Sequence, residues 1–320
     1  MSREVFEKSH ELQWRVLEAS VERLEKNRGG EAAPDFPELY RQVCHHLALA
    51  RHRRYGADLE VRLNRLVLRG HQQLYRSRAG DLAAALRFVT AGFPRLVRSE
   101  AKLVLLSLLL FAGPLIAMGV AVPWRPELAL SVLPPATVEE MGQQYAPGGS
   151  LHAGRPVDSD LLMFGFYIYN NIGIAFRTFA SGILGGLGSI FFLVYNGLVI
   201  GAVTGHIEHM GYEGNFYPFA IGHGAFELTA IVLAGAAGLR LGLSLLAPGR
   251  LSRGEALLGA GRRAIGMVYG VAGMLTIAAF LEAFWSSSSL VPATVKLIVG
   301  GLLWLYVLFY FLIAGRSHGS

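Results

Sequence analysis

Charged residues are scarce in this chain of 320 residues. Asp, Glu, Lys and Arg together make up 16% of it, against about 25% in an average soluble domain. Hydrophobic residues make up 52%, and the mean hydropathy is +0.41. A compact soluble protein cannot bury that much apolar surface, so the composition excludes an ordinary globular domain. It predicts an all-α fold, a polytopic bundle of membrane helices.

Cysteine is nearly absent. Cys44 is the only one, so no disulfide can form within the chain, and we expect this residue on the cytoplasmic side. The polar N-terminal sequence MSREVFEKSHELQW has no short apolar segment before a small-residue cleavage site, so it does not resemble a signal peptide. We therefore expect the first hydrophobic span to serve as its own insertion signal.

Common signatures of catalysis are also missing. The sequence has no HExxH, GxSxG, P-loop or dinucleotide fingerprint, and no zinc-finger or RNA-binding signature. These absences predict a protein that is not an enzyme, needs no cofactor, binds no metal and has no nucleic-acid partner. The first 99 residues are nevertheless basic, with 18 Lys and Arg against 12 Asp and Glu, whereas the remainder has 11 of each. Beside a membrane, such a segment indicates attraction to anionic lipid.

Residues 1–99 are expected to form a helical cytoplasmic module that lies against the lipid surface. Three amphipathic stretches predict helices, at about 2–28, 38–55 and 57–76. The expected apolar face of the first helix comprises Val5, Leu12, Val16 and Leu24.

Six hydrophobic stretches follow in residues 100–316, each near the ~20 residues that a membrane span requires. The expected spans are 100–122, 161–183, 186–206, 217–246, 264–285 and 291–314. The basic segments precede the first span, follow the fourth and end the chain, whereas the other loops are acidic or neutral. The positive-inside rule then predicts that both termini are cytoplasmic.

Glycines at four-residue spacing indicate where the spans pack closely. The predicted packing glycines are Gly185, Gly197, Gly201, Gly205, Gly224, Gly238 and Gly242. Because a glycine stripe follows one whole face of the third span, we expect this span at the centre of the bundle. A seam between two copies of the chain, in a homodimer, is the alternative.

A few strongly polar side chains lie deep within the spans, where an unpaired polar group is costly. The predicted buried polar core comprises Asn170, Asn171, Asn196, His223 and Glu227. At about 1.5 Å per residue, Asn171, Asn196 and Glu227 reach mid-membrane depth from three separate spans, so we expect them to meet and to hydrogen-bond. Arg177 is the expected interface anchor, because a long basic side chain can reach the membrane surface.

These residues allow more than one chemistry. The amides and the acid can join helices by hydrogen bonds. His223 and Glu227, one helical turn apart, can instead form a proton relay, an ion site or, with His206 and His209, part of a metal site. The lack of a third firm ligand argues against the metal site. The glycines on either side of His223 predict a break or a re-entrant half-helix in the long fourth span.

Four segments carry a family resemblance: FPRLVR (Phe93–Arg98), NNIGIAFRTFASGILGGLGS, LVYNGLVIGAV and GHGAFELTAIVLAGAAGL. They are similar to the stage II sporulation protein M family of integral membrane proteins, over about residues 90–315. This resemblance implies a polytopic scaffold that assembles with peptidoglycan-degrading partners and localises them during engulfment. The positions that match its motifs are Asn170, Asn171, Arg177, Asn196, Gly197, His223, Gly224 and Glu227.

We therefore predict a non-enzymatic, multi-pass protein of the bacterial plasma membrane that acts as a scaffold for membrane or cytoplasmic partner proteins. The alternative is a transporter, or an ion- or proton-conducting protein, built around Asn171, Asn196 and Glu227. A third interpretation is an intramembrane metal-dependent hydrolase, which requires a bound metal ion.

Overall fold

The computed structural model describes residues 2–26, 35–74, 82–149 and 157–316. Every regular element within these ranges is a helix, which confirms the predicted all-α class. The chain divides into two compact units, Met1–Ala85 and Leu86–Ser320. The division lies before the expected boundary at residue 99, because α5 (Phe93–Ser99) packs on helices of the second unit.

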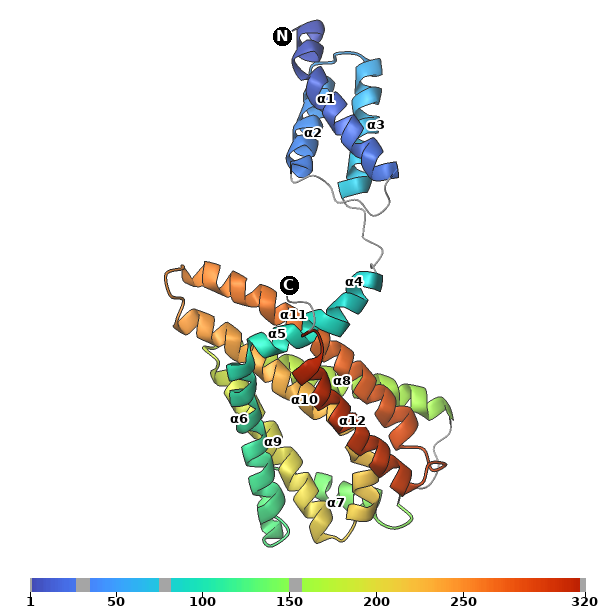
Figure 1. Cartoon of the computed structure of the whole chain (residues 1–320), viewed down its shortest axis with the longest axis vertical. Coiled ribbons are helices and arrows are strands. Elements are labelled where there is room, and N and C mark those ends of the chain that lie inside the picture. The colour runs from blue at the N-terminus through green and yellow to red at the C-terminus, as the bar shows by residue number, and fades with distance from the viewer. Residues whose placement is uncertain (1, 27–34, 75–81, 150–156, 317–320) are drawn as a thin grey trace. The chain divides into compact units, whose positions relative to one another are not determined.

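The first unit is a bundle of three helices, α1 (Arg3–Lys26), α2 (Phe36–His52) and α3 (Ala57–Leu74) (Figure 1). The three predicted N-terminal helices are thereby confirmed. Their apolar faces pack on one another and form a core that belongs to this unit alone. The side chains at its centre are completely buried: Trp14, Leu17, Val21, Val43 and Leu63. Burial of this apolar surface is the main term that stabilises the bundle.

The predicted apolar face of α1 is largely wrong. Leu24 is buried, but Val5, Leu12 and Val16 are 54%, 74% and 45% exposed. The buried face consists of Phe6, Trp14, Leu17, Val21 and Leu24. The structure buries the stripe with the two aromatic side chains, because these remove the most apolar area from water.

The second unit continues the chain from α4 (Leu82–Arg87), which spans the boundary between the units. Its first elements are a π-helix η1 (Phe88–Gly92), α5, α6 (Ala101–Ala121), a 3₁₀-helix η2 (Pro126–Ser131) and α7 (Pro135–Tyr145). Its later elements are α8 (Val157–Ala180), a 3₁₀-helix η3 (Ser181–Ile183), α9 (Leu187–His209), α10 (Glu213–Leu246), α11 (Arg253–Phe280), a π-helix η4 (Leu281–Ser286) and α12 (Ala293–Ile313).

Five helices of the described chain are long and apolar enough to cross a membrane. They are α6, α9, α10, α11 continued by η4, and α12, and they coincide with five of the six predicted spans. The remaining predicted span, 161–183, is α8, whose Asn170, Asn171 and Arg177 lower its hydropathy. The region 123–160 was expected to be a loop, but it contains η2 and α7, which pack on α9.

α10 is the central helix of the second unit. It packs against α6, α8, α9, α11 and α12, which surround it in Figure 1. Its buried residues include many alanines and glycines, which let neighbouring helices approach closely. This arrangement corrects the prediction that the third span, α9, is central.

α10 also runs without interruption from Glu213 to Leu246, so the predicted break beside His223 is wrong. An unbroken helix satisfies its own backbone hydrogen bonds, which apolar surroundings would otherwise leave unpaired.

The glycine stripe of α9 faces α6 within the same chain, and the two helices lie side by side (Figure 1). A Cβ added at Gly201 would lie 2.9 Å from the Cβ of Met118, and one added at Gly205 would lie 2.8 Å from the Cβ of Val122. A Cβ at Gly197 would collide with the carbonyl oxygen of Phe111. The stripe is therefore a packing seam inside one chain, which is the role that glycine spacing has in membrane bundles.

The other predicted packing glycines divide into two groups. A Cβ at Gly238 would lie 2.7 Å from the carbonyl oxygen of Phe179, and one at Gly242 would lie 2.5 Å from the carbonyl carbon of Gly185. These contacts hold α10 against the end of α8 and against the turn that follows it. A Cβ at Gly224 would meet nothing within 4 Å, so the predicted packing role of Gly224 is wrong.

Two charged residues next to the start of α6 connect the helices of the second unit. Arg98 donates hydrogen bonds to the carbonyl oxygens of Phe311 (2.8 Å) and Ala314 (2.7 Å) at the end of α12. Glu100 is buried and forms an ion pair with Arg240 of α10, at 3.3 Å. The first contact satisfies carbonyl groups that the end of a helix leaves without partners.

Candidate functional site

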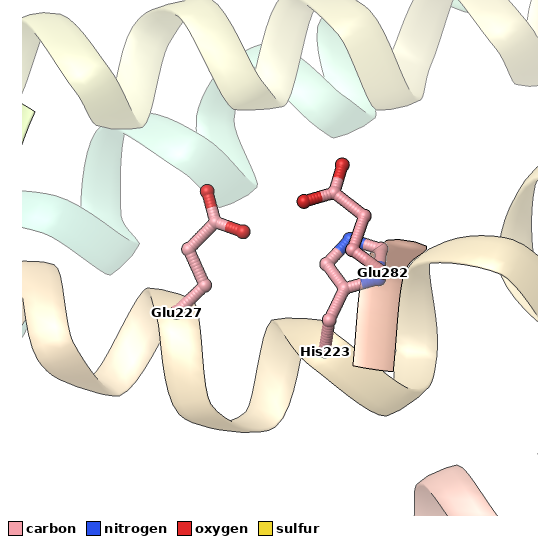
Figure 2. Close-up of side chains that lie close together, drawn as sticks. All are labelled: His223, Glu227 and Glu282. Carbon is pink, nitrogen blue, oxygen red and sulfur yellow. The ribbon is translucent and has the colours of Figure 1, made fainter. Parts of the chain in front are cut away.

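Three side chains with metal-ligating atoms converge where α10 meets η4. His223 and Glu227 lie on α10 and Glu282 lies on η4, and one ligand atom of each lies within 4.8 Å of the other two. Figure 2 shows the carboxyl groups of Glu227 and Glu282 and the ring of His223 directed toward one space. We refer to these three residues as the His–Glu–Glu cluster.

The local helical geometry explains how these residues meet. His223 and Glu227 are four residues apart on an uninterrupted helix, so both side chains project from the same face. Glu282 lies in a π-helical turn, which carries one extra residue and rotates the side chains that follow relative to those of α11. π-Helical turns often occur at functional sites, because they reorient one side chain without ending the helix. Ala279 and Ala283 flank Glu282 and are completely buried.

His223 is 8% exposed, and its ring nitrogens have different surroundings. Nδ1 shares a hydrogen bond of 3.2 Å with Oγ of Ser286, a residue of η4. The edge of the ring packs on Phe219, with 5.2 Å between ring centroids. The ring also hydrogen-bonds to the backbone of Phe219. The bond to Ser286 uses Nδ1, so Nε2 is the nitrogen that this bond leaves for a ligand.

Glu227 is half-buried in apolar surroundings. No hydrogen bond or ion pair joins its carboxyl group to any described residue. A partly buried carboxylate without partners is costly, so a proton or a bound cation would stabilise this group. One ligand atom each of His223 and Glu282 lies within 4.8 Å of its carboxyl group.

A pocket of about 260 Å³ lies next to the His–Glu–Glu cluster. It is lined by the start of α10, by the serine-rich turn after η4 and by the start of α12. Phe219 and Ser286 line this pocket and also contact His223. Lys296 closes one side, where its Nζ donates hydrogen bonds of 2.7 Å to the carbonyl oxygens of Ser286 and Ser288. The pocket therefore offers a polar approach to the immediate neighbours of His223.

The asparagines that the sequence placed in the same core form hydrogen bonds elsewhere. Asn196 donates to the carbonyl oxygen of Phe192, one turn earlier on α9, at 2.6 Å. Asn170 donates to Oδ1 of its neighbour Asn171 at 3.2 Å, and Asn171 is 4% exposed. Among the described residues, no hydrogen bond connects either asparagine segment to Glu227, so the structure does not join the three by the predicted hydrogen bonds. Equal depth along separate helices does not fix the direction in which each side chain points.

The other predicted residues also lie outside the cluster. Arg177 is exposed, and its Nε donates a hydrogen bond of 3.1 Å to the carbonyl oxygen of Gly173 on its own helix. His209 Nδ1 lies 3.2 Å from the carbonyl oxygen of Pro123, and His206 is buried near the end of α9. Neither histidine belongs to the group that contains His223.

Glu282 is the residue that the sequence analysis missed, and it adds a third side chain with a metal-ligating atom to His223 and Glu227. The sequence does distinguish Glu282, because it is the only acidic residue in the fifth predicted span, 264–285. An ionisable residue within a membrane span is a functional candidate by default. Its register relative to α10 depends on the π-helical turn, which periodicity does not reveal.

Two family models match parts of this chain. Residues 105–287 match the family model of stage II sporulation protein M, and residues 4–76 match a domain of unknown function (DUF8413). Neither a curated protein nor a solved structure matches the chain. The first match covers more than half of the chain and includes all three residues of the His–Glu–Glu cluster. The apolar helices and this match agree that the chain is a membrane protein, and it belongs to the stage II sporulation protein M family.

Proposed function

We propose that this chain is a non-enzymatic scaffold of the bacterial plasma membrane, whose N-terminal unit holds a partner protein beside the membrane. The observation that carries this proposal is the separate core of the first unit. Its three helices bury their own apolar faces. One family model matches this unit, and another matches the second unit, Leu86–Ser320, which we call the membrane unit. A self-contained domain that is tethered to a membrane bundle keeps whatever it binds near the bilayer.

The surface of α1 offers a contact for such a partner. Val5, Leu12 and Val16 are exposed and lie on one face of the helix, although the core of the bundle does not use them. Exposed apolar side chains that follow a helical stripe are a common way to bind a partner helix or groove. The expected partner is a cytoplasmic protein or the cytoplasmic domain of a membrane protein, which requires both termini to be cytoplasmic.

Site-specific photo-crosslinking in living cells tests this function. A photoreactive amino acid at Leu12 or Val16 should give a discrete crosslinked product, whereas the same amino acid at Glu22, an exposed position on another face of the helix, should not. Leu12→Asp should abolish the product obtained at Val16 while the protein accumulates normally. If no position on the first unit gives a specific product, the scaffold proposal is wrong.

A second candidate function is the transport or conduction of an ion. The observation in its favour is the pocket beside the His–Glu–Glu cluster, because transporters place ionisable residues within the bilayer where water can reach them. If the chain is a transporter, Glu227→Gln should abolish pH-dependent flux in liposomes. If it is a scaffold, the same substitution should leave its function intact. The absence of flux of protons, alkali cations and divalent cations in wild-type liposomes would exclude transport.

A further inference from the structure

We propose that His223, Glu227 and Glu282 bind a divalent transition-metal ion within the membrane unit. This inference goes beyond the scaffold function and does not depend on it. It begins from the convergence of one imidazole and two carboxylates, from α10 and η4, with ligand atoms within 4.8 Å of one another (Figure 2). These are the side chains that supply nitrogen and oxygen ligands to zinc, manganese and iron.

Charge favours a cation at this place. Two ionised carboxylates whose oxygens lie within 4.8 Å of one another repel, and a divalent ion neutralises both of them. A shared proton also relieves the repulsion, but a metal ion in addition binds the imidazole through Nε2, the nitrogen that the bond to Ser286 does not use. The nearest basic residue that lines the neighbouring pocket, Lys296, directs its Nζ to two backbone carbonyl oxygens.

The spacing of the ligand atoms fits a metal after small side-chain movements. Ligand atoms about 2.1 Å from a tetrahedral ion lie about 3.4 Å from one another. The observed separations of up to 4.8 Å can shorten to this value through changes in the terminal torsions of the two glutamates. Three protein ligands leave a fourth position for water, as in zinc sites that are not purely structural.

The groups around the cluster support His223 in the role of a ligand. Histidines that bind metals usually hydrogen-bond through the second ring nitrogen, which fixes the orientation of the ring. Nδ1 of His223 has such a partner in Ser286 Oγ at 3.2 Å, and the packing of Phe219 restricts the ring further. Ser286 lies on the same π-helix as Glu282, so one local distortion supplies both a ligand and the residue that orients another ligand.

A pocket and a polar group without a hydrogen bond to the described residues lie close to His223. The pocket of about 260 Å³ reaches Phe219 and Ser286, the two residues that contact the His223 ring. Nε1 of Trp285 is buried and makes no hydrogen bond within the described chain. Its ring packs beside Gly222, next to His223, with Cδ1 3.9 Å from the position of an added Cβ.

The mixture of ligands predicts selectivity among ions. Magnesium and calcium prefer oxygen ligands only, whereas an imidazole favours ions such as Zn²⁺ and Fe²⁺. We therefore expect Zn²⁺ to bind more tightly than Mn²⁺, and Mg²⁺ and Ca²⁺ not to displace it.

The test is metal binding by the full chain in detergent after removal of metals with a chelator. Calorimetric titration with Zn²⁺ should give one ion per chain. Glu227→Gln, Glu282→Gln and His223→Gln should each weaken binding by more than about 100-fold. Glu213→Gln, which removes an exposed acid at the start of the same helix, should bind zinc as the wild type does. X-ray absorption at the zinc edge should show only nitrogen and oxygen ligands.

Two results would overturn the proposal. One is a wild-type protein that binds no stoichiometric Zn²⁺ or Mn²⁺, which would leave a shared proton as the explanation of the paired acids. The other is undiminished binding by all three cluster variants, which would place the ion elsewhere. Gel filtration and thermal unfolding of each variant without metal confirm that lost binding does not reflect lost folding.

Discussion

Ser286 and His223 are 63 residues apart in the chain, and their side chains share a hydrogen bond of 3.2 Å inside the membrane unit. This contact holds the imidazole ring through Nδ1, on the side opposite to Nε2. Because residues that orient a metal ligand affect affinity without touching the ion, the Ser286–His223 contact leads to the first prediction.

Ser286→Ala should weaken Zn²⁺ binding by about 10- to 100-fold while it leaves one ion per chain. The ring of His223 would lose its orienting partner but would still be able to ligate. The measurement is the same calorimetric titration as for the wild type. Ser288→Ala is the matched control, because Ser288 lines the same pocket but its Oγ accepts from the backbone of Leu290. Equal affinities for the two variants would remove Ser286 from the site.

Gly201→Ala should destabilise the membrane unit by about 1–3 kcal/mol. The added Cβ would lie 2.9 Å from the Cβ of Met118 and even closer to the carbonyl oxygen of Leu115, so α9 must move away from α6. Thermal unfolding in detergent measures the change. The control is Gly113→Ala on α6, where an added Cβ meets nothing within 4 Å and alanine favours the helix. A neutral Gly201→Ala would show that the two helices do not pack along this stripe.

Glu100→Gln should destabilise the protein by about 1–3 kcal/mol, because it leaves a partly buried guanidinium without its counter-charge. Glu100 is 6% exposed and lies 3.3 Å from Nε of Arg240, although the two groups are too poorly aligned for a hydrogen bond. Arg263→Gln is the comparison, because Arg263 is more exposed and lies 3.9 Å from the same carboxylate. Its effect should stay below about 1 kcal/mol. The free energy of unfolding in detergent separates these outcomes.

The first unit should lose stability as the pH falls from about 6.5 toward 4. Burial, with smaller contributions from His10 and His45, lowers the pKa of His46 from 6.5 to about 4. Below pH 6.5 the unfolded chain takes up a proton that the folded unit does not, so folding becomes less favourable by about 1–3 kcal/mol. Above pH 6.5 the full stability is present.

Fluorine NMR of labelled Trp14 in the full chain checks this pH dependence in urea titrations, because its Nε1 lies 3.2 Å from His46 Nδ1. A Trp14→Phe variant assigns the signal. His46→Gln keeps an acceptor for the indole but does not titrate, so its urea midpoint should change less between pH 7 and pH 5. An unchanged pH dependence in that variant would assign the effect to another group.

Cysteine labelling checks the orientation on which the scaffold proposal depends. In a Cys44→Ser background, a cysteine at Ser287 should react with an impermeant maleimide added to intact cells, and a cysteine at Ser252 should react only after lysis. The reason is that basic residues surround Ser252 but not Ser287. The opposite pattern would place the first unit outside the cell.

Much of the fold could be predicted because it depends on local composition. Uninterrupted apolar stretches such as 101–121 and 293–313 must be helical in a membrane, since no other structure satisfies their backbone hydrogen bonds. The polar residues Asn170, Asn171 and Arg177 within α8 could also be recognised, because they interrupt a hydrophobic stretch of the sequence. Helix rotation is different, because it depends on which neighbours are present. The hydrophobic periodicity of α1 therefore predicted that Leu12 is buried, whereas the bundle buries Trp14 and Leu17 instead.

The candidate site shows the same limit. His223 and Glu227 could be singled out because each is costly in an apolar helix and they are one turn apart. Asn196 met the same criterion of depth, yet its amide hydrogen-bonds to its own helix. Glu282 lies near an end of its span, and a π-helical turn places it beside the other two. Depth can be counted along a sequence, but the direction of a side chain around the helix axis cannot.

The sequence by itself determined that this chain is a helical membrane protein with a separate N-terminal module, because hydrophobicity and charge act on each segment before any tertiary contact forms. Only the tertiary structure decided that α10 is the central helix and that Glu282, rather than an asparagine, joins His223 and Glu227. The physical reason is that close packing, here through glycines and alanines on α9 and α10, fixes the rotation of each helix. That rotation determines which polar groups share one space.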